Sequence, residues 1–248
     1  MPYRKDQFAN SEIYHIISRG VNGMTLFNDE DDYYRMIFSI YELNNSLPTT
    51  IRDRREERNR FKKQNRSQSS EIFWIDKRDN FLEILSFCFM PNHFHLLVRQ
   101  LKDGGITKFM SKVGTGYAGY FNRRYKRKGY VFQNRFKSMH VENDDYIKTL
   151  FTYIHANPIS LLESNWKELG IKDPKKAIDF LENNYRWSSY QDFIGKTNFP
   201  SVTKRNFLYE LMGGENGCKS AVKDWIAYKN TLLNAQENLQ RTGLWELL

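Results

Sequence analysis

The stretch FLEILSFCFMPNHFHLLVRQ, residues Phe81–Gln100, decides the fold. Two apolar runs, Leu82–Met90 and His93–Arg99, stand on either side of Pro91-Asn92. Both runs are short and rich in residues that favour β-strands, and Pro-Asn is a turn dipeptide. They predict an antiparallel hairpin in the middle of a β-sheet.

Helical and strand patterns continue on both sides of this hairpin. The expected elements are a strand at Glu12–Arg19, a helix from Asn28 to about Tyr41 capped by Asn28 or Asp29, the two hairpin strands, a helix from Ile106 to about Lys126, a strand at Arg135–Val141 and a helix from Asn143 to Asn157 that ends at Pro158. This order matches the ferredoxin-like split pattern, an antiparallel sheet backed by helices. We therefore expect an α+β domain over residues 1–158.

The remaining residues, 159–248, are expected to form a helical C-terminal extension. The predicted helices are Ser160–Leu169, Pro174–Phe193, Lys204–Leu211 and Lys219–Leu232. No motif in this part indicates what the extension does.

A basic insertion over about residues 45–72 separates the first predicted helix from the hairpin. Between Ile51 and Gln68 it holds eight Lys or Arg residues and three acids, with almost nothing to bury. Such a composition favours a solvated insertion or a mobile helical arm. A role in gripping DNA is a second interpretation.

Positive charge is concentrated in one other segment. The chain has a formal net charge of +9 and a pI near 9.4, and the segment Gly104–Val141 holds nine Lys or Arg residues without a single Asp or Glu. Aromatic side chains alternate with these cations. Cations track phosphates and aromatic rings stack on unpaired bases, so the segment predicts single-stranded nucleic acid as partner. The alternative is a helix with aromatic residues in the core and cations in water.

The candidate DNA contacts are drawn from this segment. They are Lys108, Lys112, Arg123, Arg124, Lys126, Arg127, Lys128, Gln133, Arg135 and Lys137.

Cysteine usage and hydropathy narrow the class of protein. Cys88 and Cys218 lie far apart and form neither a metal motif nor a disulfide framework. No signal segment opens the chain, and nowhere do about 18 apolar residues follow one another. We expect a soluble cytoplasmic protein with no membrane contact.

Four residues form a candidate chemical site. His93 and His95 are two apart on a predicted strand, so both imidazoles point to one face and supply half of a metal site. Tyr153 and Asn157 are four apart and share a helix face. A phenol is a nucleophile once a metal, cation or base assists it, and a carboxamide oxygen suits a hard cation. The alternatives are a core histidine beside a solvent-facing one, a core tyrosine and a helix-terminal asparagine.

Other histidines and tyrosines were weighed against these four. His15 is expected to be structural, His155 to point away from the metal, and His140 to lie at the surface or face DNA. Tyr130 and Tyr146 are rival nucleophiles, but neither has an asparagine four residues later.

Three segments together resemble a known family. The runs FMPNHFHLLV (Phe89–Val98), GYVFQNRFKS (Gly129–Ser138) and YIHANP (Tyr153–Pro158) are similar to the REP-associated tyrosine transposases, which belong to the single-tyrosine branch of the HUH superfamily. YHIISRG (Tyr14–Gly20) and YRWSSYQDFIG (Tyr185–Gly195) resemble it too.

The resemblance implies a ferredoxin-like catalytic domain that cleaves and rejoins single-stranded or hairpin DNA. It makes Tyr153 the nucleophile of a 5′-phosphotyrosine intermediate, and His93, His95 and Asn157 the ligands of Mg²⁺ or Mn²⁺. Two other functions stay open: a non-catalytic DNA- or RNA-binding protein on the same scaffold, and a metal phosphoesterase that uses water. The sequence does not distinguish a monomer from a homodimer.

Overall fold

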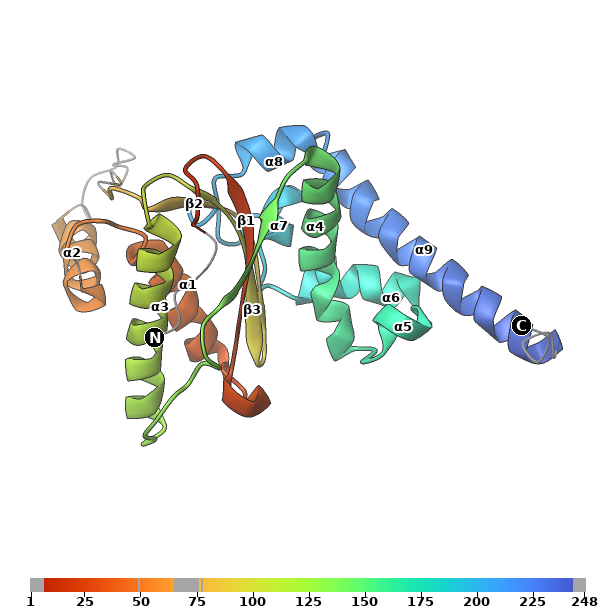
Figure 1. Cartoon of the computed structure of the whole chain (residues 1–248), viewed down its shortest axis with the longest axis horizontal. Coiled ribbons are helices and arrows are strands. Elements are labelled where there is room, and N and C mark those ends of the chain that lie inside the picture. Colours follow the sequence, from red (N-terminus) through yellow and green to blue (C-terminus); the bar gives the residue numbers. More distant parts are fainter. Residues whose placement is uncertain (1–6, 49, 65–75, 77, 243–248) are drawn as a thin grey trace. The chain divides into compact units, whose positions relative to one another are not determined.

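The computed structural model describes residues 7–48, 50–64, 76 and 78–242. Four strands form one antiparallel sheet in the order β2-β3-β1-β4: β1 (Ile13–Arg19), β2 (Leu82–Met90), β3 (His93–Gln100) and β4 (Lys137–Val141). Helices α1 (Glu30–Glu42) and α3 (Gly105–Arg124) occupy the two predicted positions, and α4 (Asp144–Ala156) follows β4 (Figure 1). The α+β prediction is confirmed, and each strand boundary falls within two residues of the expected one.

The hairpin forms because its two strands bury apolar side chains and its turn is held from outside. Most side chains of β2 and β3 are buried. In the turn, the backbone oxygen of Pro91 accepts from Leu26 N at 2.7 Å, and that of Asn92 accepts from Gly20 N at 2.8 Å. These bonds satisfy carbonyl groups that a tight turn cannot pair within itself.

The chain divides into two compact units. The first comprises Met1–Ile84, Pro91–His93 and Val98–His140, and the second Leu85–Met90, Phe94–Leu97 and Val141–Leu248. Helix α4 is thus grouped with the C-terminal helices. The predicted boundary at residue 158 stays a prediction.

Helices α1 and α3 pack against each other in the first unit (Figure 1). The N-cap of α1 is Asp29, whose side chain accepts from Asp32 N at 3.2 Å. The buried Tyr117 of α3 donates its hydroxyl hydrogen to the backbone oxygen of Leu26 at 2.6 Å. That bond lets a polar tip enter the core at no net desolvation cost.

The basic insertion is not simply solvated where the structure describes it. Residues Ile51–Gln64 form α2, and the carboxylate of Glu42, completely buried at the end of α1, accepts from Arg54 Nε at 2.9 Å and from Arg58 Nε at 2.8 Å. The expectation of a purely solvated arm was wrong for this helix, because a buried carboxylate outside the insertion requires cationic partners. Residues 65–75 of the insertion lie outside the described residues.

The C-terminal extension is helical but differs in its divisions. Its elements are a 3₁₀ turn (Asn157–Leu161), α5 (Trp166–Leu169), α6 (Pro174–Asp179), a π-helical turn (Phe180–Asn184), α7 (Tyr190–Phe193), α8 (Asn206–Leu211) and α9 (Gly214–Thr242). No helix in the described part of the chain is long and apolar enough to cross a membrane.

The single helix predicted over Pro174–Phe193 is wrong. The chain leaves the helix at Tyr185, and the next residues pair with β2: Phe89 N donates to Trp187 O at 2.9 Å, and Ser189 N donates to Phe87 O at 3.0 Å. Strand β2 is at the edge of the sheet, so its outer backbone groups need partners from outside the sheet. The extended segment supplies them.

Candidate functional site

Tyr153 and Asn157 stand one turn apart at the C-terminal end of α4. Asn143 caps this helix by accepting from Tyr146 N at 2.9 Å, and Pro158 follows its last turn. The Asn157 amide donates from Nδ2 to the backbone oxygen of Tyr153 at 2.9 Å. This bond orients the carboxamide, so that Oδ1 is the atom presented to a cation. Asn157 is buried and Tyr153 is half-buried.

His95 lies against the nucleophile candidate. Its ring is buried on β3, and its centroid is 5.7 Å from that of Tyr153 with the rings nearly perpendicular, at 87°. His95, Tyr153 and Asn157 all belong to the second unit. The structure therefore brings together three of the four residues singled out from the sequence.

His93, the fourth residue, belongs to the first unit and begins β3. Its Nδ1 lies 2.7 Å from Oδ1 of Asn92, whose Nδ2 donates to Gly23 O at 3.5 Å. A carboxamide oxygen only accepts, so Nδ1 carries the hydrogen and the ring presents the lone pair of Nε2. That is the tautomer a metal ligand requires, fixed by a neighbouring acceptor.

Sequence reasoning missed Lys167 on α5. Its ammonium group donates to Tyr153 Oη at 3.3 Å and to Asn157 Oδ1 at 2.9 Å, and it lies 4.5 Å from the centre of the Tyr153 ring. No local signal marks this lysine, because it stands in a part of the chain without a recognisable motif. Only the packing of α5 reveals it.

The donor set fits a hard or borderline divalent cation. Two imidazoles and one carboxamide oxygen suit Mn²⁺, and suit Mg²⁺ when further oxygens complete the shell. Asn157 Oδ1 already accepts from a cation, the Lys167 ammonium. Among the described residues no cluster of three His, Cys, Asp or Glu side chains forms a metal site, so an Asn oxygen has to supply the third ligand.

The remaining histidines serve the core or the surface. His155 is buried, its Nε2 lies 2.9 Å from Ser189 Oγ, and burial lowers its pKa to about 3. The prediction that it points away from the metal residues is confirmed by this contact. His15 is buried, and burial lowers its pKa to about 4. His140 pairs at the surface with Glu12 at 2.7 Å.

The candidate DNA contacts separate into two groups. Lys112 donates to the backbone oxygen of Asn45 at 2.6 Å, and Arg124 pairs with Asp29 at 2.7 Å and with the buried Asp32 at 3.3 Å. These two cations already have protein partners. The exposed candidates are Lys108, Arg123, Lys126, Lys128, Gln133, Arg135 and Lys137, with Arg127 half-buried.

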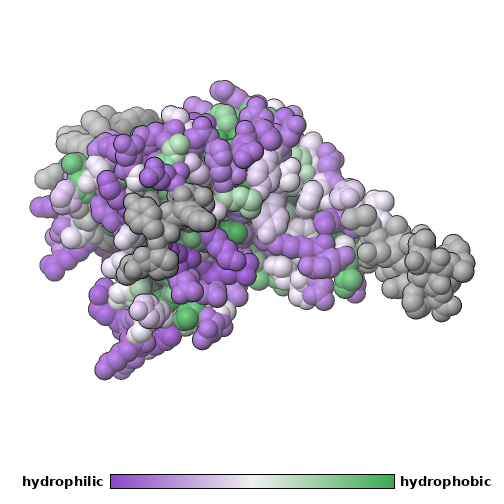
Figure 2. Space-filling view, viewed as in Figure 1, coloured by the Kyte–Doolittle hydropathy of each residue, from purple (hydrophilic) through white to green (hydrophobic). Residues whose placement is uncertain are grey.

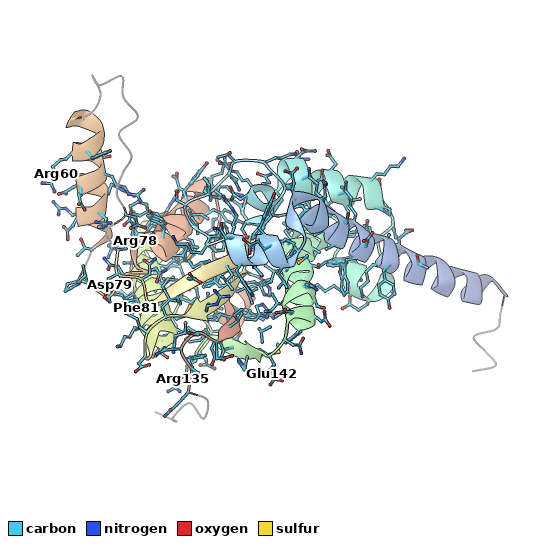
Figure 3. All side chains as sticks on the ribbon, turned by 90° about the horizontal axis from the view of Figure 1, so that it is seen from above. Arg60, Arg78, Asp79, Phe81, Arg135 and Glu142 are labelled. Carbon is cyan, nitrogen blue, oxygen red and sulfur yellow. The ribbon has the colours of Figure 1, made fainter. Side chains whose placement is uncertain are left out.

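The exposed group surrounds a protruding aromatic ring. Tyr130, in the loop after α3, is 86% exposed. The end of α3 and this loop, at the lower left of Figure 1, are mostly hydrophilic in Figure 2. Arg135 lies at the periphery in Figure 3. All of these residues belong to the first unit.

Comparison with known proteins agrees with the resemblance seen in the sequence. A family model described as "Transposase IS200 like" matches residues 49–157, a stretch that includes both histidines, Tyr153 and Asn157. The solved structure of a REP-associated tyrosine transposase bound to a REP hairpin is 13% identical, with a TM-score of 0.47 over 82% of this chain and 90% of that one. No curated protein matches the chain significantly.

Proposed function

We propose that this chain, which is similar to the IS200-like transposases over residues 49–157, cleaves and rejoins single-stranded or hairpin DNA through Tyr153. The observation that carries the proposal is the packing of Tyr153 beside His95, with Asn157 one helical turn away. A phenol, an imidazole and an oriented carboxamide oxygen are the groups that metal-assisted phosphodiester attack requires.

In the proposed cleavage step, Tyr153 Oη attacks the scissile phosphorus. The phosphorus–Oη bond forms while the bond to the 3′-oxygen breaks; the phenol gives up its proton and the 3′-oxygen acquires one. The products are a 5′-phosphotyrosyl link and a free 3′-hydroxyl group. Rejoining is the reverse, and since the phosphodiester bond is conserved, no nucleotide cofactor is consumed.

His93, His95 and Asn157 are the proposed holders of Mg²⁺ or Mn²⁺. A bound divalent ion would orient the scissile phosphate and offset its developing negative charge. The two histidines occupy alternate positions of β3, so their side chains leave the same face of that strand. The exposed cations and Tyr130 are the proposed contacts for the DNA backbone and bases.

A covalent-adduct assay tests this function. Single-stranded hairpin oligonucleotides labelled at the 5′ or the 3′ end are incubated with the protein and Mn²⁺, and the products are separated on a denaturing gel. We expect a shifted band that carries the 3′ label, absent with chelator, in Tyr153→Phe and in His95→Ala. Tyr146→Phe, on the same helix, is the matched control and should form the adduct.

Two outcomes would favour the other functions. Binding of hairpin DNA without any adduct favours a non-catalytic binding protein. Cleavage that persists in Tyr153→Phe identifies water as the nucleophile, as in a metal phosphoesterase.

A further inference from the structure

We infer that Lys167 is a second catalytic residue, which stabilises the negative charge on the Tyr153 oxygen when the DNA strand is rejoined and the tyrosine departs. The inference rests on the proposed function and adds a residue to it. It also gives the C-terminal extension a task, because Lys167 lies on α5 and α9 holds α5 in place.

The contacts of Lys167 converge on the reacting atom. Its Nζ reaches Tyr153 Oη at 3.3 Å, and the same ammonium group donates to Asn157 Oδ1 at 2.9 Å. It also lies 4.5 Å from the centre of the Tyr153 ring, within the range of a cation–π contact. One cation therefore touches both the proposed nucleophile and the amide one turn beyond it.

The charge of Lys167 is not neutralised within the described part of the protein. No described carboxylate lies within ion-pairing distance of its Nζ, which contacts only neutral oxygens and aromatic rings. A half-buried ammonium group that serves only to join two helices is more cheaply satisfied by a carboxylate. A lysine aimed at a phenol instead suits an anion that arises during the reaction.

The reaction creates that anion at Tyr153 Oη. In rejoining, the 3′-hydroxyl oxygen bonds to phosphorus, the phosphorus–Oη bond breaks, and its electron pair stays on Oη. Lys167 keeps its proton and donates a hydrogen bond to this oxygen. Because a charged donor aimed at developing charge stabilises the transition state more than the ground state, it lowers the barrier. The cleavage step passes through the same transition state and gains equally.

Helix α9 fixes the position of Lys167 through the backbone. Helix α5 has only four residues, so its own hydrogen bonds do not hold it firmly. Lys229 of α9 donates from Nζ to the backbone oxygen of Lys167 at 2.9 Å, and Asn230 donates to Ile171 O at 2.7 Å. The adjacent Trp166 is buried. Lys229 is thus a positioning residue that acts through Lys167.

Single-turnover rates of cleavage and of rejoining test the inference. Lys167→Met is expected to slow both by about 10²-fold, the usual cost of losing one donor to a developing oxyanion. Lys167→Arg, which keeps the positive charge, should recover most of the loss. Lys229→Met should show a smaller loss of the same kind. Lys175→Met, an exposed lysine on α6, is the matched control and should react like the unaltered protein.

A fluorinated tyrosine at position 153 separates a charge effect from a structural one. 3,5-Difluorotyrosine is the better leaving group, so it should restore much of the rejoining rate in Lys167→Met and change the rate of the unaltered protein much less. If Lys167 only supports the fold or acts through Asn157, fluorination has the same effect in both backgrounds, and the inference is overturned.

The two proposals fail in different ways. If the unaltered protein forms no adduct, or Tyr153→Phe still forms one, the proposed function is wrong. If the adduct forms and Lys167→Met reacts as fast as Lys175→Met, only the role of Lys167 is wrong.

Discussion

Helix α2 and the segment Gly104–Val141 are both strongly basic, yet their cations have different fates. In α2, Arg54 and Arg58 bind the buried carboxylate of Glu42, and Arg52 pairs with Glu56 at 2.9 Å. In the second segment most cations are exposed and the sequence offers no acid among them. Similar composition therefore serves the fold in one region and leaves charge available in the other.

The difference depends on carboxylates that lie elsewhere in the chain. Glu42 at the end of α1 recruits the arginines of α2, and Asp29 and Asp32 at the start of α1 recruit Arg124. A count of charges along the sequence cannot reveal such pairs. It overstates the cations available to a polyanion wherever a neighbouring element buries an acid.

The largest expected effect is the loss of stability in Glu42→Gln. The substitution leaves Arg54 and Arg58 without their anion, at side-chain exposures of only 12% and 32%. We expect the free energy of unfolding, measured by urea denaturation, to fall by about 3 kcal/mol. Glu56→Gln, which breaks the exposed pair with Arg52, is the control and should leave the midpoint almost unchanged. Equal midpoints for the two variants would mean that Glu42 does not anchor α2.

The next effect concerns affinity for single-stranded DNA. Replacing Lys126, Lys128 and Arg135 by glutamine should weaken binding at least about tenfold near 0.1 M salt and lower the slope of log K against log salt by about 2, since each lost phosphate contact on single strands accounts for about 0.7. Fluorescence anisotropy over a salt series measures both quantities.

A matched variant of α2 provides the comparison. Arg55, Arg60 and Lys63 are exposed, and Arg60 extends outward from α2 in Figure 3. Replacing these three by glutamine removes the same charge, and we expect a much smaller change in affinity and slope. A slope that falls as far as in the first variant would make α2 a DNA-gripping arm, the second interpretation of the insertion.

The sequence predicted elements whose causes are local. The hairpin strands were identified from two apolar runs around Pro91-Asn92, and α4 from its cap at Asn143 and its stop at Pro158. The break after Tyr185 was missed because its cause, the outer edge of β2, lies about 100 residues earlier. A helical period continues through that break, so no local pattern contradicts the wrong assignment.

The candidate site shows the same limit. The pairing of Tyr153 with Asn157 follows from helical spacing, whereas the approach of His95 to Tyr153 and that of Lys167 to both α4 residues depend on packing. A resemblance in motifs suggested the first approach. Nothing in the sequence indicated the second.

The smallest expected effect tests whether the basic segment binds bases as well as phosphates. Tyr130 is held at the tip of a loop whose base is firmly bonded: Asn122 Nδ2 donates to Gly129 O at 2.9 Å, and Val21 N donates to Val131 O at 2.9 Å. Gly129 has a φ of 94°, which residues with side chains rarely adopt. The loop thus keeps its shape without help from the exposed ring.

Tyr130→Leu should therefore leave the unfolding midpoint unchanged and weaken binding of single-stranded DNA by about 1 kcal/mol, or about fivefold, the lower end of the range for one stacked base. Tyr228→Leu, an exposed tyrosine of α9, is the control. The loss should persist at high salt, because stacking does not depend on counterion release. If the loss instead disappears as salt rises, Tyr130 assists only the neighbouring cations, and the basic segment binds the phosphate backbone alone.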